Sequence, residues 1–330
     1  MQRFASTDGV SFVATFEVDS IFADRYQIKK PLGKGGMGMV YLVRDWELKR
    51  DLALKTLLPK YAKNSQAVRR FRREVSVAQQ LDHPCVVKIF DARKHEDILF
   101  YTMEYFDGKT LRDLMRAREG RGQHMGVGST VRILSLICHA LEHAHEITIH
   151  RDVTPENVMV LPNGDVKLLD FGLAKLSTMD ADLTKVGISL GKIQYTAPEQ
   201  RADAKNVDLR ADIYSLGVMF YEMLSGQFPL GNKKLMELVP DLPAECDALV
   251  CKATAEKPED RHSSAKEFRL ELQAVYELIR GVRISGVADA EPVLESGTEK
   301  LPVFTAMDDN RPRWQQWLYA LRSRLLFWTR

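Results

Sequence analysis

The hydrophobic pattern changes its period near Gly108, and this change constrains the fold more than any other feature of the chain. From Tyr26 to Leu57 apolar residues alternate with polar ones and glycines interrupt them, which is typical of strands joined by turns. Two more strand-like runs follow, Val86–Asp91 and Ile98–Tyr105. Beyond Gly108 the spacing is mainly helical. The pattern therefore predicts an α+β fold, with a small sheet that carries one helix and then a larger helical part.

Helical spacing predicts where the main helices lie. The first covers residues 65–80, with Ser65 as its N-cap and Phe71 and Val75 on its apolar face. A long helix should carry the stripe from Val131 to His145. The nearly all-apolar segment Ala211–Leu224 is expected to be a buried helix that ends at Gly226. Two further helices are predicted at 244–256 and 263–280, followed by a linker over 281–312.

Composition excludes several classes of protein. The 330 residues are 45% hydrophobic and 28% charged, which is ordinary for a globular chain, and they contain no long apolar run or secretory signal. Four scattered cysteines make neither a disulfide framework nor a zinc site, so we expect reduced thiols and a cytoplasmic location. The formal net charge of the chain is +2. The last twenty residues contain five arginines and no acidic residue, so the rest of the chain carries a net negative charge. We therefore expect no nucleic-acid partner.

A glycine-rich segment, Gly33–Val40, lies between two predicted strands. Glycines at 33, 35 and 38 would let the backbone approach an anionic group closely. Dinucleotide sites also use such glycines, but they need a helix directly afterwards, and here Met39–Val43 continues as a strand. Considered alone, the segment fits a phosphate-binding loop and a simple tight hairpin equally well.

Lys55 closes the apolar strand that contains Ala53. An inward-facing lysine needs an anionic partner, because an unpaired buried ammonium is costly. Glu74 on the following helix or a nucleotide phosphate could supply that charge. The simpler interpretation is a lysine that extends to the surface.

The stretch Ile149–Asn157 reads Ile-His-Arg-Asp-Val-Thr-Pro-Glu-Asn, and two predicted strands follow it. After them come Asp170-Phe171-Gly172 and, later, Ala197-Pro198-Glu199. With the glycine-rich segment and Lys55, these motifs match the protein kinase signatures in type, order and spacing over about residues 26–280. The chain resembles a protein kinase, in particular the bacterial relatives of eukaryotic Ser/Thr kinases.

The resemblance implies a bilobal fold with an antiparallel N-lobe sheet, and ATP- and Mg²⁺-dependent phosphorylation of protein Ser/Thr residues, with Mn²⁺ as a substitute metal. Asp152 would orient the substrate hydroxyl and take its proton, while Asn157 and Asp170 would bind the metal. Lys55, fixed by Glu74, would hold the α- and β-phosphates. The residues implied for ATP are Gly33, Lys34, Gly35, Gly36, Gly38, Val40, Ala53, Lys55, Met103 as gatekeeper, Glu104, Phe106 and Met159.

Other matching residues are expected to have structural roles. Asp212 should tie down the backbone of the catalytic loop, and Glu199 should pair with Arg261. His150 is expected to pack beneath Phe171 rather than to act as a base. The expected regions are an extension at 1–25, an N-lobe at 26–108, a C-lobe at 109–280, the linker at 281–312 and a tail at 313–330.

Two positions depart from the family pattern. Ser/Thr kinases usually carry lysine two residues after the catalytic aspartate, where it reaches the γ-phosphate, and here that residue is Thr154. They usually carry threonine where this chain has Lys192, directly after Gly191. One hypothesis is an exchange that keeps the charge, with Lys192 catalytic beside Asp152 and partnered by the Thr154 hydroxyl. The alternative is a lost lysine, in which case a pseudokinase scaffold that binds nucleotide and partners without turnover becomes possible.

Regulation is predicted at two places. Arg151 precedes the catalytic aspartate, as in kinases whose activation loop is phosphorylated, and Thr184 is the first candidate for autophosphorylation there. The tail at 313–330 places three tryptophans and several leucines on one helical face beside four arginines. That pattern suits an anionic membrane interface at the inner face of the membrane, or docking on the kinase or a second copy.

Overall fold

The computed structural model describes residues 16–35, 38–58, 61–62, 64–171, 190–202, 206–229 and 233–285. The predictions for most of the N-terminal extension, for Gly36, for the phosphosite Thr184 and for the tail at 313–330 concern residues outside these ranges.

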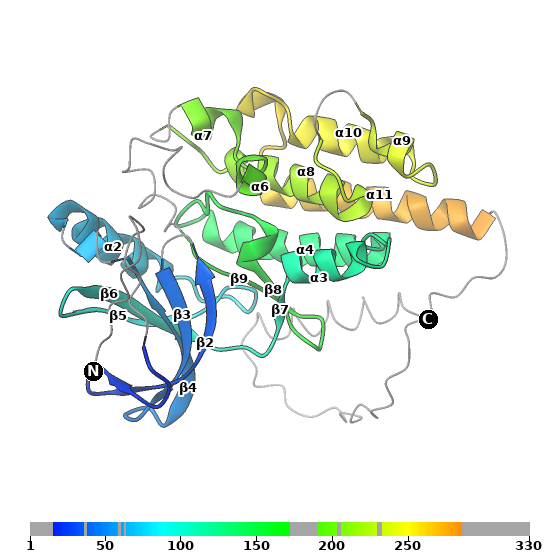
Figure 1. The fold of residues 1–330 in the computed structure, drawn as a ribbon. Coiled ribbons are helices and arrows are strands. Elements are labelled where there is room, and N and C mark those ends of the chain that lie inside the picture. The colour runs from blue at the N-terminus through cyan, green and yellow to red at the C-terminus, as the bar shows by residue number, and fades with distance from the viewer. Residues whose placement is uncertain are drawn as a thin grey trace, which may run out of the picture. The chain divides into compact units, whose positions relative to one another are not determined.

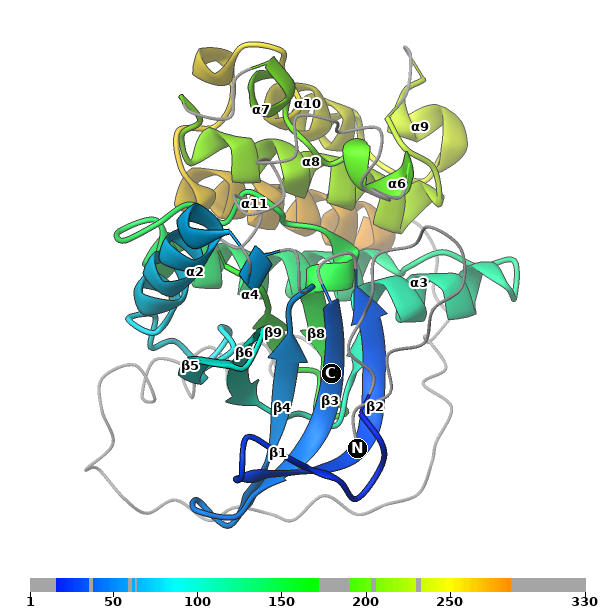
Figure 2. The ribbon, with the colours of Figure 1, turned by 60° about the vertical axis from the view of Figure 1, so that its left-hand side comes forward.

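The N-terminal lobe is built on a six-stranded antiparallel sheet with the order β1-β2-β3-β4-β6-β5. Its strands are β1 (Ile21–Phe22), β2 (Tyr26–Gly35), β3 (Gly38–Asp45), β4 (Arg50–Thr56), β5 (Ile89–His95) and β6 (Ile98–Glu104). Alternate strand residues point to one face, where Tyr26, Val43, Leu54 and Phe100 form a buried core. The helix α2 (Ser65–Ala78) lies beside β5, as Figure 2 shows. The predicted α+β fold, with an antiparallel sheet in the N-terminal lobe and a helix near residues 65–80, is confirmed.

Helix α2 begins one residue earlier than the sequence predicts. Asn64, not Ser65, is the N-cap: its side-chain oxygen accepts from the backbone N–H groups of Gln66 at 2.9 Å and Ala67 at 3.2 Å. Either residue type can cap a helix, so the sequence leaves this choice open. The predicted apolar face is correct, since Phe71 and Val75 are buried.

The C-terminal lobe is mainly helical (Figure 1). Its helices are α3 (Leu111–Glu119), α4 (Val127–Ala144), α6 (Leu190–Ile193), α7 (Pro198–Ala202), α8 (Arg210–Ser225), α9 (Leu235–Leu238), α10 (Ala244–Ala253) and α11 (Ala265–Ser285), with 3-10 turns η1 (Pro155–Asn157) and η2 (Pro258–Asp260). A small antiparallel sheet consists of β7 (Lys109–Thr110), β8 (Val158–Val160) and β9 (Val166–Leu168). The hairpin of β8 and β9 directly follows the catalytic-loop sequence, as predicted, and so fixes where that loop ends.

Helix α8 packs against both α4 and α10 and is buried on nearly every side. It stops at Gly226, whose φ of +70° favours glycine and ends the helix, as the sequence predicts. Helix α11 instead continues to Ser285, five residues beyond the predicted end and into the predicted linker. Apolar residues at helical spacing, such as Val275 and Ile279, are buried and support its length.

The cysteines are free thiols, and only Cys251 is exposed. Burial raises the pKa of Cys85 and Cys246 to about 12, which keeps both protonated and unreactive. Within the described ranges, no helix combines the length and the apolar character needed to cross a membrane.

Candidate active site

The glycine-rich segment forms the end of the β2–β3 hairpin. Gly33 pairs with Val40 and Gly35 with Gly38, so the segment runs strand to strand, as predicted. A Cβ at Gly38 would lie 1.7 Å from the carbonyl oxygen of Thr56, and the φ of Gly38 is +157°. A glycine is therefore required at position 38, because any side chain would push the hairpin away from the end of β4. No atom lies within 4 Å of a Cβ built at Gly33.

Lys55 is a buried cation on β4 that pairs with Asp170. Its Nζ lies 2.5 Å from Asp170 Oδ2, and the hydroxyl of Tyr101 donates to Asp170 Oδ1 at 2.7 Å. Tyr101 reaches this point because it is the strand neighbour of Lys55 between β4 and β6. Glu74, the partner expected from the sequence, is buried on α2. Its pairing with Lys55 stays a prediction.

The surroundings of Asp170 keep its carboxylate ionised. Burial alone would raise its pKa, but the Lys55 ammonium and the hydrogen bonds from Lys55 and Tyr101 outweigh this and lower the pKa below its ordinary value. Its φ of +59° is rare for a residue with a side chain and costs roughly 1–3 kcal/mol, so the surrounding contacts must hold it. The next residue, Phe171, is buried and packs on His150 with ring centroids 4.5 Å apart, as predicted.

The residues expected around adenine lie on neighbouring strands. Ala53 on β4 is the register partner of Met103 on β6, and both are buried. Beyond Met103, the N–H of Glu104 is occupied by the carbonyl of Lys88 at 2.9 Å, so an adenine ring could use only the carbonyl of Glu104. The Lys167 ammonium lies 4.6 Å from the ring centroid of Phe106. Val40 on β3 is half-buried, and so is Met159 on β8.

The catalytic loop brings Asp152, Asn157 and Lys192 together. Asn157 Nδ2 donates to the backbone oxygen of Asp152 at 2.7 Å and to Asp152 Oδ2 at 2.8 Å. Lys192, at the end of α6, donates from Nζ to the same Oδ2 at 3.1 Å. Nothing in the described part of the chain hydrogen-bonds Asp152 Oδ1, so that oxygen can accept a proton from outside.

Asp212 holds the backbone of this loop, as the resemblance implies. Its fully buried carboxylate accepts from the N–H groups of His150 at 2.9 Å and Arg151 at 2.7 Å, and from His145 Nε2 at 2.9 Å. Arg151 has a φ of +67°, a conformation that needs such support. Gln200 completes the support by donating to the carbonyl oxygen of Arg151 at 3.0 Å.

Thr154 does not act as the predicted partner of Lys192. It is 1% exposed, and its hydroxyl has no hydrogen-bond partner among the described residues. The side chain is therefore buried and makes no hydrogen bond to the lysine. The predicted contact of Lys192 with Asp152 is present, whereas the predicted contact of Lys192 with Thr154 is absent.

Arg112 is a central residue that sequence reasoning missed. From α3 it donates to Glu156 of the catalytic loop at 2.8 Å, to Glu222 of α8 at 2.6 Å and to the Tyr195 hydroxyl at 2.7 Å. Tyr195 also hydrogen-bonds Glu222. Arg112 thus joins the catalytic loop to the segment after α6. In the sequence it is one of several arginines in a polar helix, and no local signal distinguishes it.

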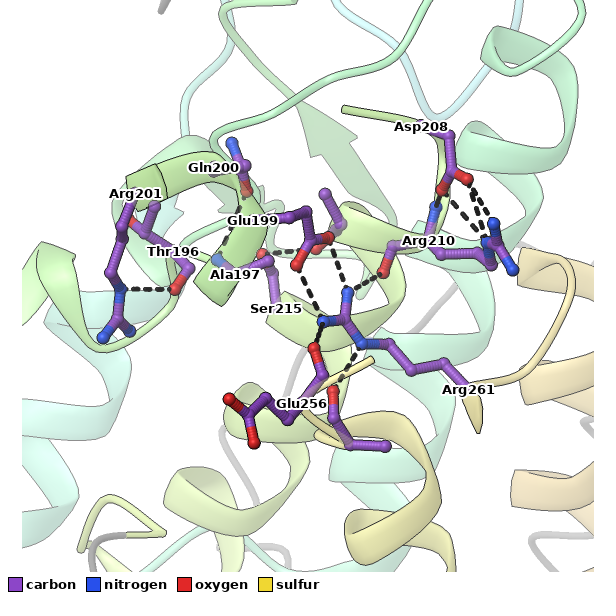
Figure 3. Close-up of polar contacts among 12 residues, drawn as sticks. Thr196, Ala197, Glu199, Gln200, Arg201, Asp208, Arg210, Ser215, Glu256 and Arg261 are labelled. Carbon is purple, nitrogen blue, oxygen red and sulfur yellow. Dashed lines mark hydrogen bonds and ion pairs between the residues drawn. The ribbon is translucent and has the colours of Figure 1, made fainter. Parts of the chain in front are cut away.

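The Glu199–Arg261 pair fixes the start of α7, as predicted (Figure 3). Arg261 donates to both carboxylate oxygens of Glu199 and also to the carbonyl oxygens of Arg210, Ala255 and Glu256. Ser215 of α8 donates to the carbonyl of Tyr195 at 2.8 Å. The segment that carries Lys192 is therefore attached to the helical core on both sides.

Comparison with known proteins agrees with this geometry. Residues 26–278 match the model of the protein kinase domain. Serine/threonine-protein kinase PknB of Mycolicibacterium smegmatis is 37% identical over 276 residues, and PrkC of Bacillus subtilis is 32% identical over 271. These alignments cover 77% and 78% of this chain but only 43% and 41% of the relatives, so the chain spans less than half of their length.

A solved structure gives the same result for the fold. The kinase domain of Mycobacterium tuberculosis PknI superimposes with a TM-score of 0.66 at 31% sequence identity, covering 80% of this chain and all of that one. The relatives support kinase activity and give no support to the pseudokinase alternative. The resemblance read from the motifs is confirmed: this chain belongs to the protein kinase family, among the bacterial Ser/Thr kinases of eukaryotic type.

Proposed function

We propose that this chain transfers the γ-phosphoryl group of ATP to serine or threonine hydroxyls of protein substrates. The observation that carries the proposal is the state of Asp152. Asn157 and Lys192 occupy one of its carboxylate oxygens and leave the other open, and its side chain is about one-third exposed. A carboxylate held in this way can receive a hydroxyl group and fix its direction.

The chemistry requires little more than alignment and charge neutralisation. The substrate hydroxyl oxygen attacks the γ-phosphorus while its proton passes to Asp152 Oδ1. The bond from the γ-phosphorus to the bridging oxygen breaks, and ADP leaves with that electron pair. Lys55 would hold the α- and β-phosphates, and the backbone of the β2–β3 hairpin from Gly33 to Gly38 would cover them.

The remaining contacts to ATP are proposed from the same positions. Val40, Ala53 and Met159 would enclose the adenine ring, with Met103 behind it. Because the N–H of Glu104 already bonds within the sheet, the Glu104 carbonyl and the backbone N–H of Phe106 are the groups proposed for the adenine edge. Lys34 would lie over the phosphates.

The donor set fits Mg²⁺. Asn157 uses its amide nitrogen for Asp152, which leaves its side-chain oxygen for a cation, and Asp170 stays ionised. Two oxygen ligands are too few for a protein-only metal site, and no cluster of three metal-binding side chains occurs among the described residues. Mg²⁺ usually takes one or two protein ligands and completes its shell with phosphate and water. When bound, Mg²⁺ would neutralise charge on the phosphate oxygens, and Mn²⁺ could replace it.

Two further proposals rest on sequence alone. Autophosphorylation is proposed at Thr184, because Arg151 is the residue type that binds a phosphate near the catalytic loop. For the tail at 313–330, binding to an anionic membrane surface is proposed from its arginines and apolar stripe. Vesicles of anionic lipid should bind the whole chain more strongly than a chain ending at 310, and equal binding would refute this. Self-association that depends on the tail would support the alternative.

The kinase proposal is tested by incubating the chain with labelled ATP and Mg²⁺, beside an Asp152→Asn variant, and mapping any phosphosite. Loss of the general base should lower the rate on the order of 10²–10⁴-fold. Asp82→Asn, which removes an exposed carboxylate paired with exposed Lys88, is the matched control and should keep full activity. Equal labelling of the parent and Asp152→Asn would contradict the proposal, and mapping that finds Thr184 unmodified in active enzyme would remove the phosphosite.

A further inference from the structure

We propose that Lys192 is the cation that binds the transferring phosphoryl group, supplied by α6 in place of a lysine on the catalytic loop. The inference rests on the proposed kinase function and assigns a catalytic residue within that same site. Position 154 holds a threonine, so the catalytic loop supplies no cation there. The cation has to come from another segment.

The geometry places an ammonium at the reacting carboxylate. Lys192 Nζ lies 3.1 Å from Asp152 Oδ2, the oxygen that Asn157 also contacts. A lysine has three N–H donors, so this contact leaves two for other acceptors. The γ-phosphoryl oxygens must come close to Asp152, because the substrate hydroxyl that Asp152 holds attacks the γ-phosphorus. Lys192 can therefore contact Asp152 and a γ-phosphoryl oxygen at the same time.

The electrostatics favour a permanent positive charge. Burial alone would lower the pKa of Lys192, but the carboxylates of Asp152, Glu156 and Asp170 outweigh this and raise it. Glu156 is already paired with Arg112, whereas Asp152 and Asp170 are the two carboxylates at which phosphate chemistry would occur. A fixed cation in contact with Asp152 offsets the repulsion that an entering phosphate would meet.

The backbone around Lys192 is held rather than loose. The carbonyl of Lys192 accepts from the Tyr195 N–H at 3.2 Å and from Thr196 Oγ1 at 3.4 Å. Arg201 donates to the carbonyls of Ile193 and Thr196, both at 2.9 Å. The hydrogen bond of Tyr195 to Glu222 ties the same turn to α8. A cation mounted on such a turn is preorganised, which is the condition for strong electrostatic catalysis.

Because residue 154 is a threonine, another residue has to supply the cation that a lysine at this position would provide. It is buried, and its hydroxyl points to no partner in the described part of the protein, so it contributes nothing to the phosphate. With threonine at 154 and lysine at 192, the site keeps one cation beside Asp152. In the reaction Lys192 keeps its proton, donates hydrogen bonds to a γ-phosphoryl oxygen throughout, and holds Asp152 toward the hydroxyl.

The test compares Lys192→Ala, Lys192→Arg and the exchange variant Thr154→Lys with Lys192→Thr. Removing one preorganised cation should lower kcat by about 10²–10³-fold. Arginine should retain much of the rate, and the exchange variant should recover at least about tenfold over Lys192→Thr alone, since the charge returns. Lys234→Thr, at the exposed N-cap of α9, is the matched control and should behave as the parent. Because Thr154 is buried, unfolding midpoints are measured first, and Lys192→Arg decides if the exchange variant is destabilised.

Calorimetry supplies a readout that does not need turnover. The parent should bind a non-hydrolysable ATP analogue more tightly than ADP, and Lys192→Ala should lose that difference while keeping its affinity for ADP. Unchanged kcat in Lys192→Ala, alongside an inactive Asp152→Asn, would overturn the role of Lys192 and leave the kinase function intact. If the parent itself fails to turn over, the kinase function fails, and an unchanged analogue-to-ADP ratio would then overturn the Lys192 proposal as well.

Discussion

Arg261 donates to both carboxylate oxygens of Glu199, at 2.7 and 2.8 Å, from a guanidinium group that is completely buried. Three backbone carbonyls occupy its other donors. Breaking one side of such a pair leaves an uncompensated buried charge, which costs more than the pair itself contributes. Arg261→Ala should therefore lower the free energy of unfolding by about 3–5 kcal/mol. Urea unfolding followed by circular dichroism measures this.

The matched control for Arg261 is Arg210, which pairs with Asp208 at the surface. Exposed pairs contribute little because water already solvates both charges, so Arg210→Ala should change the free energy of unfolding by less than about 1 kcal/mol. Equal losses in the two variants would show that burial is not what makes the Glu199–Arg261 pair strong.

Asp212 provides a prediction about activity. Asp212→Asn replaces one acceptor oxygen by an amide group, so one of the N–H groups of His150 and Arg151 loses its partner. A hydrogen bond to a charged group contributes about 1.5–3 kcal/mol, and the variant should be destabilised on that scale. The catalytic loop then loses its fixed position, so kcat should fall while ADP affinity stays the same, as steady-state kinetics and calorimetry can measure. A fall in ADP affinity equal to that in kcat would contradict a role confined to the loop.

Two glycines of the β2–β3 hairpin should respond differently to substitution by alanine, as measured by the stability of the protein. Gly38→Ala would place a Cβ 1.7 Å from the Thr56 carbonyl, so the backbone must move, and a loss of about 1–3 kcal/mol in unfolding free energy is expected. Gly33→Ala meets no atom within 4 Å, and reduced freedom of the unfolded chain should leave stability unchanged or slightly higher. Thermal unfolding of the two variants side by side checks the contrast. Equal destabilisation would contradict the close approach at Gly38.

Two histidines, the half-buried His83 and the buried His139, should make the protein sensitive to acid. Burial, with a further effect of His143, lowers the pKa of His83 from 6.5 to about 4, and burial with the nearby Arg269 charge lowers that of His139 to about 3. The charges of Lys167 and Glu142 also act on His83, in opposite directions. Since the unfolded chain binds protons more readily at both sites, stability is full above pH 6.5 and falls as the pH decreases toward 4 and 3.

At pH 5 the loss should reach up to about 2 kcal/mol for each histidine. Urea unfolding at pH 7.5, 6 and 5 measures it. His139→Gln removes one of the two groups and should flatten the decline between pH 6 and 5. A stability that does not change over this range, or a decline unaltered in the variant, would contradict the assignment.

Motifs with fixed spacing were the most reliable basis for predicting where residues lie in the chain. The positions of Lys55, Asp152, Asn157 and Asp170 follow from short local patterns, and the apolar run before Gly226 predicts α8 because burial on every side leaves no polar face. Helix ends were less certain, since neighbouring residues such as Asn64 and Ser65 can both cap a helix.

Partners in space were harder to predict than positions in the chain. The contact of Lys55 with Asp170 joins residues 115 positions apart, which no local pattern contains. In the sequence Tyr101 looks like an ordinary strand residue, although its hydroxyl donates to Asp170. Arg112 looks like a surface arginine, and its role is evident only from its contacts with three segments that are distant in the sequence. The contact of Lys192 with Asp152 could be anticipated only because two departures from the family pattern complement each other.

The buried carboxylate of Asp212 has a consequence for how the protein is made. It lies 61 residues after Arg151, whose backbone it holds in an unfavourable conformation. A ribosome produces the chain from its N-terminus, so the catalytic loop emerges well before the residue that fixes it. Likewise, Glu199 is synthesised before its partner Arg261, which follows 62 residues later. In a nascent chain, the catalytic loop and the start of α7 can therefore reach the conformations described here only after Asp212 and Arg261 have been synthesised.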